Sequence, residues 1–200
     1  AAMSLGWLIG VSYADTAKNA PPPPSSLVSA SPNSDTTTNA TRFVIDSSAS
    51  TDPSSNIFVD LKSAFAALPD DAGDVTFVIN SDFKSDKGSY EVPFDKGIAS
   101  FTITTEATTG AQIGQLNVRP NLFANGVPLT IDEKVSLYAY VYGGGNQDIK
   151  GNPSITIREN AYVEYVTGGS LNASLEGNSE IVVDGEVRTG NGGGRAESSA

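Results

Sequence analysis

Histidine and cysteine are both absent from the 200-residue sequence. Without histidine the chain has no side chain poised to exchange protons at neutral pH, and without cysteine it has no thiolate nucleophile and no disulfide. The usual ligands of a protein-bound zinc ion are missing for the same reason. Any catalysis would depend on carboxylates, lysine, arginine or tyrosine. We therefore expect a protein that is not an enzyme, with no catalytic residue, no metal site and no cofactor.

Basic residues are also scarce. The 12 lysines and arginines stand against 23 acidic residues, which gives a formal net charge of −11. Such a charge disfavours binding to nucleic acid and to anionic lipid surfaces. The length and a hydrophobic content of 38% are sufficient for one domain with a sizeable core.

The first 41 residues differ in composition from the remainder. Residues 1–14 are apolar and end in small residues, which is typical of the remnant of a secretory signal peptide, although a first strand of the domain is the alternative. This stretch is too short to span a bilayer, so we expect no membrane insertion of the mature domain. Residues 15–41 are rich in proline, serine and threonine and predict a linker. Residues 42–200 then form the folded domain, which we expect to continue beyond this fragment.

This order of segments favours display outside the cell. A secreted chain without cysteine is more typical of bacteria than of an oxidising eukaryotic compartment. The predicted location is therefore extracellular, either secreted or on a bacterial cell surface.

Glycine clusters recur at 143–145, 168–169 and 192–194, each after a short β-branched run. A period of about 25 residues with one strand-rich unit per period is typical of a solenoid. The units align three apolar segments with alternating inward and outward residues, at 129–133, 155–159 and 181–185. We interpret the glycines as corners that need backbone freedom, including positive φ.

A second strand follows in each unit. Its predicted inward residues are Val135, Leu137, Ala139 and Val141 in one unit and Ala161, Val163 and Tyr165 in the next. Upstream, residues 75–79 and 101–105 have the same strand character and are candidates for the first rungs.

One helix is predicted between Ser55 and Pro69. Its apolar residues recur at helical spacing, namely Ile57, Phe58, Leu61, Phe65 and Leu68. A helix before the first rung can cover the exposed end of a solenoid. A small α/β subdomain beside the repeats is the alternative.

A row of tyrosines is the main candidate for a binding site. Tyr138, Tyr140 and Tyr142 alternate with the inward residues and should share an outer face, joined by Tyr162 from the next rung. Exposed tyrosines stack against sugar rings or protein partners. The alternative is that they only support neighbouring rungs, because tyrosine is a good strand former.

Other polar patterns are weaker. Asp70-Asp71 and Asp132-Glu133 are paired carboxylates, but adjacent strand residues point to opposite faces and the first pair follows a proline in an expected turn. Residues 143–149 match the calcium-binding nonapeptide repeat only in part, and we expect a plain rung corner there.

The combined pattern resembles pectin-lyase-like right-handed parallel β-helices, and within them the glycine-rich repeats of adhesin-like bacterial surface proteins. The resemblance covers roughly residues 55–194 and is carried by the segments 56–68, 74–80, 98–105, 123–131, 141–145 and 153–157. The fold class it implies is all-β, a right-handed parallel β-helix (solenoid) with an N-terminal capping helix.

The enzymes of that family use aspartates with calcium and a basic residue, or aspartates with a Gly-His-Gly element. This chain has no histidine, and none of its arginines lies in a recognisable lyase motif. The resemblance therefore implies a non-catalytic display or adhesion module that binds carbohydrate or a host protein on a lateral face. The alternatives are a polysaccharide lyase or glycoside hydrolase with catalytic rungs beyond Ala200, and a purely structural stalk.

Overall fold

The computed structural model describes residues 40–82 and 88–192. The expected signal remnant at 1–14 and nearly all of the expected linker at 15–41 lie outside these residues. The described part is mostly strand, with one α-helix and one 3-10 turn. The elements are β1 (Ala40–Ile45), η1 (Pro53–Ser55), β2 (Ile57–Phe58), α1 (Leu61–Ala66), β3 (Gly73–Ile79), β4 (Ser89–Glu91), β5 (Ile98–Thr104), β6 (Ala111–Gly114), β7 (Asn121–Phe123), β8 (Leu129–Ile131), β9 (Val135–Tyr142), β10 (Ile149–Lys150), β11 (Ser154–Ile157), β12 (Tyr162–Thr167), β13 (Leu175–Glu176), β14 (Glu180–Val183) and β15 (Glu186–Asn191).

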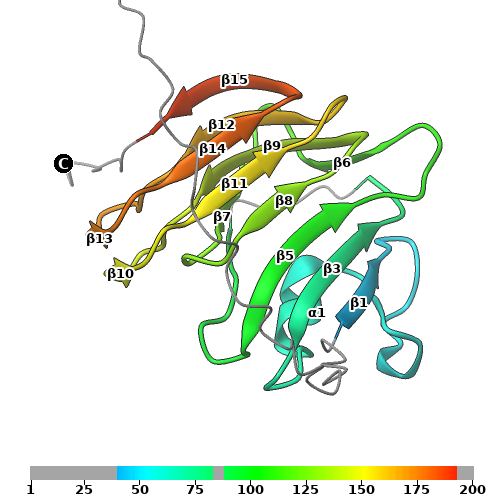
Figure 1. Cartoon of the computed structure of the whole chain (residues 1–200). Coiled ribbons are helices and arrows are strands. Elements are labelled where there is room, and N and C mark those ends of the chain that lie inside the picture. The colour runs from blue at the N-terminus through cyan, green and yellow to red at the C-terminus, as the bar shows by residue number, and fades with distance from the viewer. Residues whose placement is uncertain (1–39, 83–87, 193–200) are drawn as a thin grey trace, which may run out of the picture. The chain divides into compact units, whose positions relative to one another are not determined.

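All pairings between the named strands are parallel, and they build two large sheets and one small one (Figure 1). The first sheet has the strand order β14-β11-β8-β5-β3-β1-β2. The second has the order β15-β12-β9-β7-β4, with β6 also paired to β9, and β10 pairs with β13 in the small sheet. From β8 onward the chain visits the first, second and small sheets in turn and then repeats. The expectation of an all-β fold of parallel strands is confirmed.

The register of the first sheet matches the predicted alignment of the repeats. Leu129 pairs with Ile155 and Ile155 with Ile181, while Ile131 pairs with Ile157 and Ile157 with Val183. These aligned residues therefore stand in columns one strand apart, and all of them are buried or half-buried except Val183, which is exposed on the last strand of the sheet. The predicted strands around 75–79 and 101–105 are also confirmed, as β3 and β5, which pair with each other in parallel.

The second strand of each unit agrees with the prediction except at one residue. Val163 pairs with Leu137 as expected, but Tyr165 pairs with Tyr140 and is only half-buried, so its predicted inward position is wrong. The cause is a shift in register between Val163 and Tyr165, where β9 carries one more residue than β12. The other predicted inward residues are buried, namely Val135, Leu137, Ala139, Val141, Ala161 and Val163.

A single hydrophobic cluster joins the two large sheets. It contains inward residues of the first sheet, such as Ile103 and Ile131, together with inward residues of the second, such as Leu137 and Val163. Because both sheets contribute to one core, their other faces are turned away from it.

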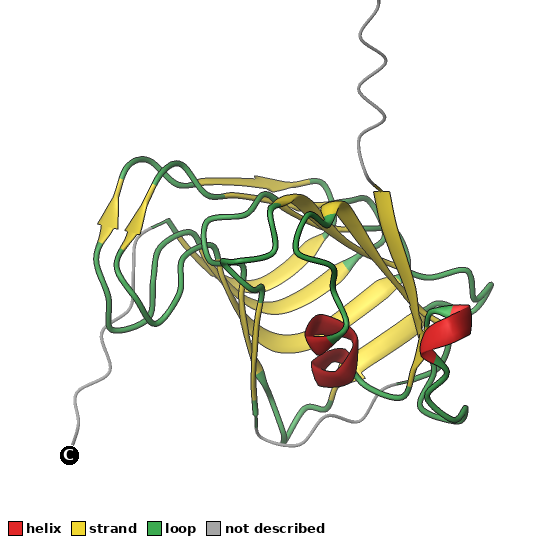
Figure 2. Cartoon of the chain, turned by 90° about the horizontal axis from the view of Figure 1, so that it is seen from below, coloured by secondary structure: helices red, strands yellow, loops and turns green. Residues whose placement is uncertain are grey.

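The predicted helix exists but is shorter than expected. Ile57 and Phe58 pair with β1 as the strand β2, and the helix begins only after Asp60, whose side chain accepts a hydrogen bond from the Ser63 backbone at 2.6 Å. The apolar residues kept a helical spacing through both β2 and α1 because both elements turn their apolar side chains toward the core. The helix contacts β1 and β2 of the first sheet and β4 of the second. In Figure 2, α1 is the red helix nearer the centre of the view, between strands of the two sheets.

The glycine clusters have a different role from the predicted one. Gly143, Gly144 and Gly145 do not have positive φ, and neither does Gly168. Instead, stacked backbones approach one another there, since the Gly143 nitrogen donates to the Thr167 oxygen at 2.9 Å. Positive φ occurs at other corners, including the equivalent pair Gly151 and Gly177, and also at non-glycine residues, namely Asn56, Asn125, Lys134, Asn160 and Asn172.

Candidate functional site

The outer face of the second sheet carries three of the four predicted site residues. Tyr138 and Tyr140 on β9 and Tyr162 on β12 are half-buried. The rings of Tyr138 and Tyr162 are 5.2 Å apart at an interplanar angle of 46°. The structure therefore brings these tyrosines together across two neighbouring strands, as the alternation predicted.

Tyr142, the fourth predicted residue, is not accessible. It is only 2% exposed, and its ring stacks on Phe123 with the centroids 5.0 Å apart. The two rings and Leu171 form a small hydrophobic cluster separate from the main core. The prediction that Tyr142 offers an exposed ring is therefore wrong, because Leu171, which follows β12 in the chain, packs over that end of the face.

Tyr165 takes its place on the same face. Its ring stacks on Tyr140 with centroids 4.6 Å apart and an angle of 16°, and the Arg119 guanidinium lies 5.5 Å from its centroid. The sequence held a signal for this position. Between Leu129 and Val163 the inward residues have odd numbers, whereas the next inward residue is Val166, so a register shift had to lie between Val163 and Val166.

A buried glutamate lies between these tyrosines and was missed by the sequence analysis. The Glu164 side chain is completely buried, and its Oε1 accepts hydrogen bonds from Arg119 Nη2 at 2.8 Å and from Arg188 Nη1. Its Oε2 accepts a hydrogen bond from the Tyr162 hydroxyl. Arg119 and Arg188 precede and follow Glu164 in the chain by many residues, so only the folded chain brings the three charges together. We call Tyr138, Tyr140, Tyr162, Tyr165, Arg119, Glu164 and Arg188 the tyrosine face.

These contacts shift the pKa values of Glu164 and Tyr162, and they also raise that of Arg188. Burial raises the pKa of Glu164, but the hydrogen bonds from Tyr162 and Arg188 and the charges of Arg188 and Arg119 outweigh it, so the pKa lies below its ordinary value. Burial, followed by the hydrogen bond to the Glu164 carboxylate, raises the pKa of Tyr162 to about 12. The shifts of Glu164 and Tyr162 favour the same state, with an ionised glutamate and a protonated tyrosine.

The raised pKa of Tyr162 gives a spectroscopic prediction. The chain has seven tyrosines, and the Tyr162 share of the phenolate absorbance near 295 nm should rise late, near pH 12. In Tyr162→Phe the late part of the rise should shrink by the absorbance of one tyrosine. Because the folded pKa lies above the ordinary value of 10, the stability from Tyr162 is present below pH 10 and is lost as the pH rises through 12. A titration curve that Tyr162→Phe leaves unchanged in shape would contradict the assignment.

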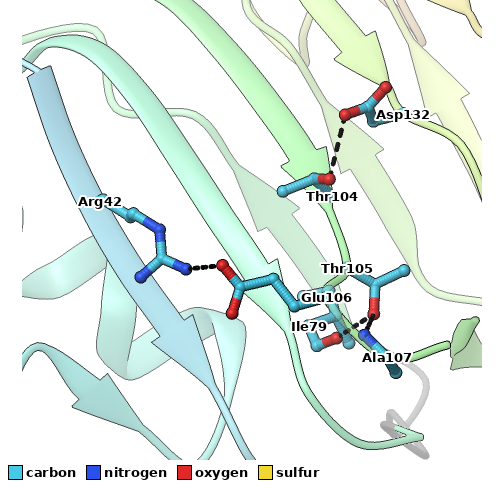
Figure 3. Close-up of polar contacts among 7 residues, drawn as sticks. All are labelled: Arg42, Ile79, Thr104, Thr105, Glu106, Ala107 and Asp132. Atoms are coloured by element: carbon cyan, nitrogen blue, oxygen red, sulfur yellow. Dashed lines mark hydrogen bonds and ion pairs between the residues drawn. The ribbon is translucent and has the colours of Figure 1, made fainter.

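Asp132 and Asp70, which belong to the paired carboxylates of the sequence, lie on other parts of the fold. The Asp132 carboxylate accepts a hydrogen bond from Thr104 at 3.0 Å, and Figure 3 shows this pair beside the ion pair of Arg42 and Glu106. Asp70 is exposed and pairs with Lys96 at 2.7 Å. Asp132 and Asp70 thus each accept a hydrogen bond from a neighbouring strand or loop.

The segment at 143–149 forms a corner between β9 and β10. Asp148 accepts a hydrogen bond from the Ser174 backbone nitrogen at 2.8 Å, and thereby joins equivalent positions of two successive units.

Within residues 40–82 and 88–192, no group of three or more acidic side chains is placed to hold a metal ion. No helix in the same part of the chain combines the length and apolar character of a membrane span.

No protein-family model, no curated protein and no solved structure matches this chain. The function must therefore be argued from the tyrosine face itself.

Proposed function

We propose that this chain is a non-catalytic display or adhesion module that binds a carbohydrate or a host protein through the tyrosine face. The single observation that carries the proposal is the pairing of half-exposed rings in two columns, Tyr138 with Tyr162 and Tyr140 with Tyr165. Stacked rings on a sheet lose little conformational freedom on binding, and they present an apolar platform with hydroxyl groups at its edge.

The proposal includes the architecture that presents this face, a right-handed parallel β-helix. It is supported by the parallel pairing of the named strands and by the regular passage of the chain from sheet to sheet. Parallel connections of this kind are nearly always right-handed. The α1 helix at the first strands is the proposed cap, because it contacts both large sheets there.

The proposed location is outside a bacterial cell. It rests on the apolar segment at 1–14 and the proline-rich and serine-rich segment that follows, both of which precede the described fold. A binding face on a stacked β-structure suits this location because repeat structures present extended surfaces for binding.

Glu164 supports the proposal in a further way. A carboxylate with no exposure, held by two arginines and a tyrosine, fixes the positions of the surrounding side chains. Binding sites gain affinity when their side chains are held in place before the ligand arrives. Fixing these side chains is therefore the role that we propose for this buried charge.

Capture experiments test the proposal. The immobilised chain should retain a ligand from a glycan array or from a panel of extracellular matrix proteins, and Tyr138→Ala should reduce that retention about fivefold because one stacked ring is lost. The far-ultraviolet circular dichroism spectrum should stay unchanged, since Tyr138 is only half-buried.

A matched control lies on the outer face of the first sheet. Thr130 pairs with Thr102 and Thr156 there and is also half-buried. Thr130→Ala should leave capture unchanged. Equal losses with both variants would contradict a specific tyrosine face, and no capture from either panel would favour a purely structural stalk.

A further inference from the structure

One end of the column that contains the rings of Tyr140 and Tyr165 adjoins a hollow. The outer face of the second sheet holds a column of side chains in the order Ser89, Asn121, Tyr140, Tyr165 and Thr189, because each residue pairs with the next on the neighbouring strand. Strands in a sheet are about 4.8 Å apart, so the column repeats at that distance. The two rings stack at 4.6 Å, which matches the repeat.

Rings occupy only two positions of this column. Tyr165 covers one side of the Tyr140 ring, and on the other side the next positions carry the short side chains of Asn121 and Ser89. A hollow of about 420 Å³ lies there, lined by Gly88, Ser89, Asn117, Arg119, Asn121 and Tyr140. Pockets of about this volume hold small ligands or single units of longer ones.

The lining combines one ring with several hydrogen-bonding groups. Tyr140 provides an apolar surface, Asn117 and Asn121 provide amides, and Ser89 provides a hydroxyl. The Arg119 guanidinium is held at the edge by Glu164 and by the Tyr165 ring. A pyranose has the matching chemistry, with an apolar ring face for stacking and hydroxyl groups around its rim.

Charge argues for a neutral sugar. Arg119 is the charged side chain in the lining of the hollow, and Glu164 already pairs with it and with Arg188. The whole chain carries a net charge of −11, which repels polyanions. An acidic polysaccharide would therefore meet an arginine that is already compensated and a chain of its own sign.

We infer that this hollow binds one pyranose unit of a neutral glycan, stacked on Tyr140 as the next ring of the column. The inference rests on the proposed function, because it names the ligand class and the position within the tyrosine face. The sugar ring fills the place that Asn121 leaves open, and the amides of Asn117 and Asn121 bind its hydroxyls.

Two substitutions in the same column separate this site from the rest of the face. Asn121→Tyr puts a ring into the hollow beside Tyr140, whereas Thr189→Tyr adds a ring at the other end, beyond Tyr165. Both add the same side chain to an outward strand position, and tyrosine favours strands, so both variants should fold. Only the first one blocks the hollow.

The test is isothermal titration with cellotetraose, maltotetraose, mannotetraose and xylotetraose, and with tetragalacturonate as the anionic comparison. At least one neutral tetrasaccharide should bind, Asn121→Tyr should weaken its affinity by about tenfold or more, and Thr189→Tyr should change it by less than about twofold.

Three results would overturn the inference. They are binding that Asn121→Tyr leaves unchanged, a preference for tetragalacturonate, and no binding of any neutral probe. If wild-type chain still captures a partner that Tyr138→Ala weakens and Asn121→Tyr does not, the proposed function stands and only the hollow is wrong. If no partner is captured at all, both fail.

Discussion

Replacing Glu164 with glutamine is expected to lower the free energy of unfolding by about 3 kcal/mol, as the removal of one partner from a buried ion pair typically does. The glutamate side chain is fully buried, and the side chain of Arg119 is only 22% exposed. Glutamine keeps the shape but removes the negative charge, so the guanidinium of Arg119 loses its compensating partner. Urea unfolding followed by circular dichroism measures the change.

Glu186→Gln is the matched control. Glu186 lies on the same face of the sheet and is exposed, so its charge remains in water. We expect its loss to change the free energy of unfolding by less than about 0.5 kcal/mol. Equal losses in the free energy of unfolding for the two variants would show that the burial of the Glu164 charge does not increase its contribution to stability.

Acid should remove the difference between wild type and Glu164→Gln. The pKa of Glu164 is lowered in the folded state, so its contribution to stability is present above the ordinary value of 4.5 and is lost as the pH falls through the folded value. The two unfolding curves should therefore approach each other below pH 4.5. A constant gap down to the most acidic conditions at which both fold would contradict the shift.

Replacing Gly143 with alanine is expected to be comparably damaging, with a loss of about 3 kcal/mol from overpacking against a rigid neighbour. A methyl group at this position would collide with the backbone carbonyl oxygen of Gly168 and lie 3.1 Å from Pro153 Cβ. The carbonyl belongs to the next unit of the stack, and the Gly168 backbone nitrogen donates a hydrogen bond to the Asn191 oxygen of β15 at 2.9 Å, which holds this part of the chain in place. Thermal unfolding should show a fall in Tm of about 9 °C.

Gly190→Ala is the control for this substitution. A methyl group there would meet Val166 Cγ1 at 3.6 Å and Val187 Cγ1 at 3.8 Å, which are ordinary contacts. Its backbone does not have a positive φ. We expect stability unchanged or slightly raised, since alanine restricts the unfolded chain. A large loss of stability in Gly190→Ala, or no loss in Gly143→Ala, would contradict the explanation that the close approach of the Gly168 backbone requires glycine at position 143.

The sequence predicted the strands of the repeats well because each buries one face. Alternation at Leu129 to Ile131 and at Ile155 to Ile157 leaves only one register that keeps the aliphatic residues inside, and the observed pairing has that register. The helix was less well predicted. Ile57 and Phe58 fit a helical spacing as well as a strand, and only their pairing with β1 decided between the two.

The tyrosine face was predicted in part. Strand alternation correctly placed Tyr138, Tyr140 and Tyr162 on one face. It could not show that Leu171 packs near Tyr142, because that contact depends on the path of the chain after β12. It also misplaced Tyr165, since a one-residue difference between neighbouring strands reverses every later side chain.

By itself, the sequence determined a chain without histidine or cysteine, with repeated parallel strands, one buried stripe and an outward row of tyrosines. These properties follow from composition and from local periodicity, and both can be determined from residues that are close together in the sequence. Only the tertiary structure decided that Arg119 and Arg188 meet at Glu164, and that Gly143 lies against Gly168. Those contacts join residues of different units, and their geometry exists only when the units are stacked in register.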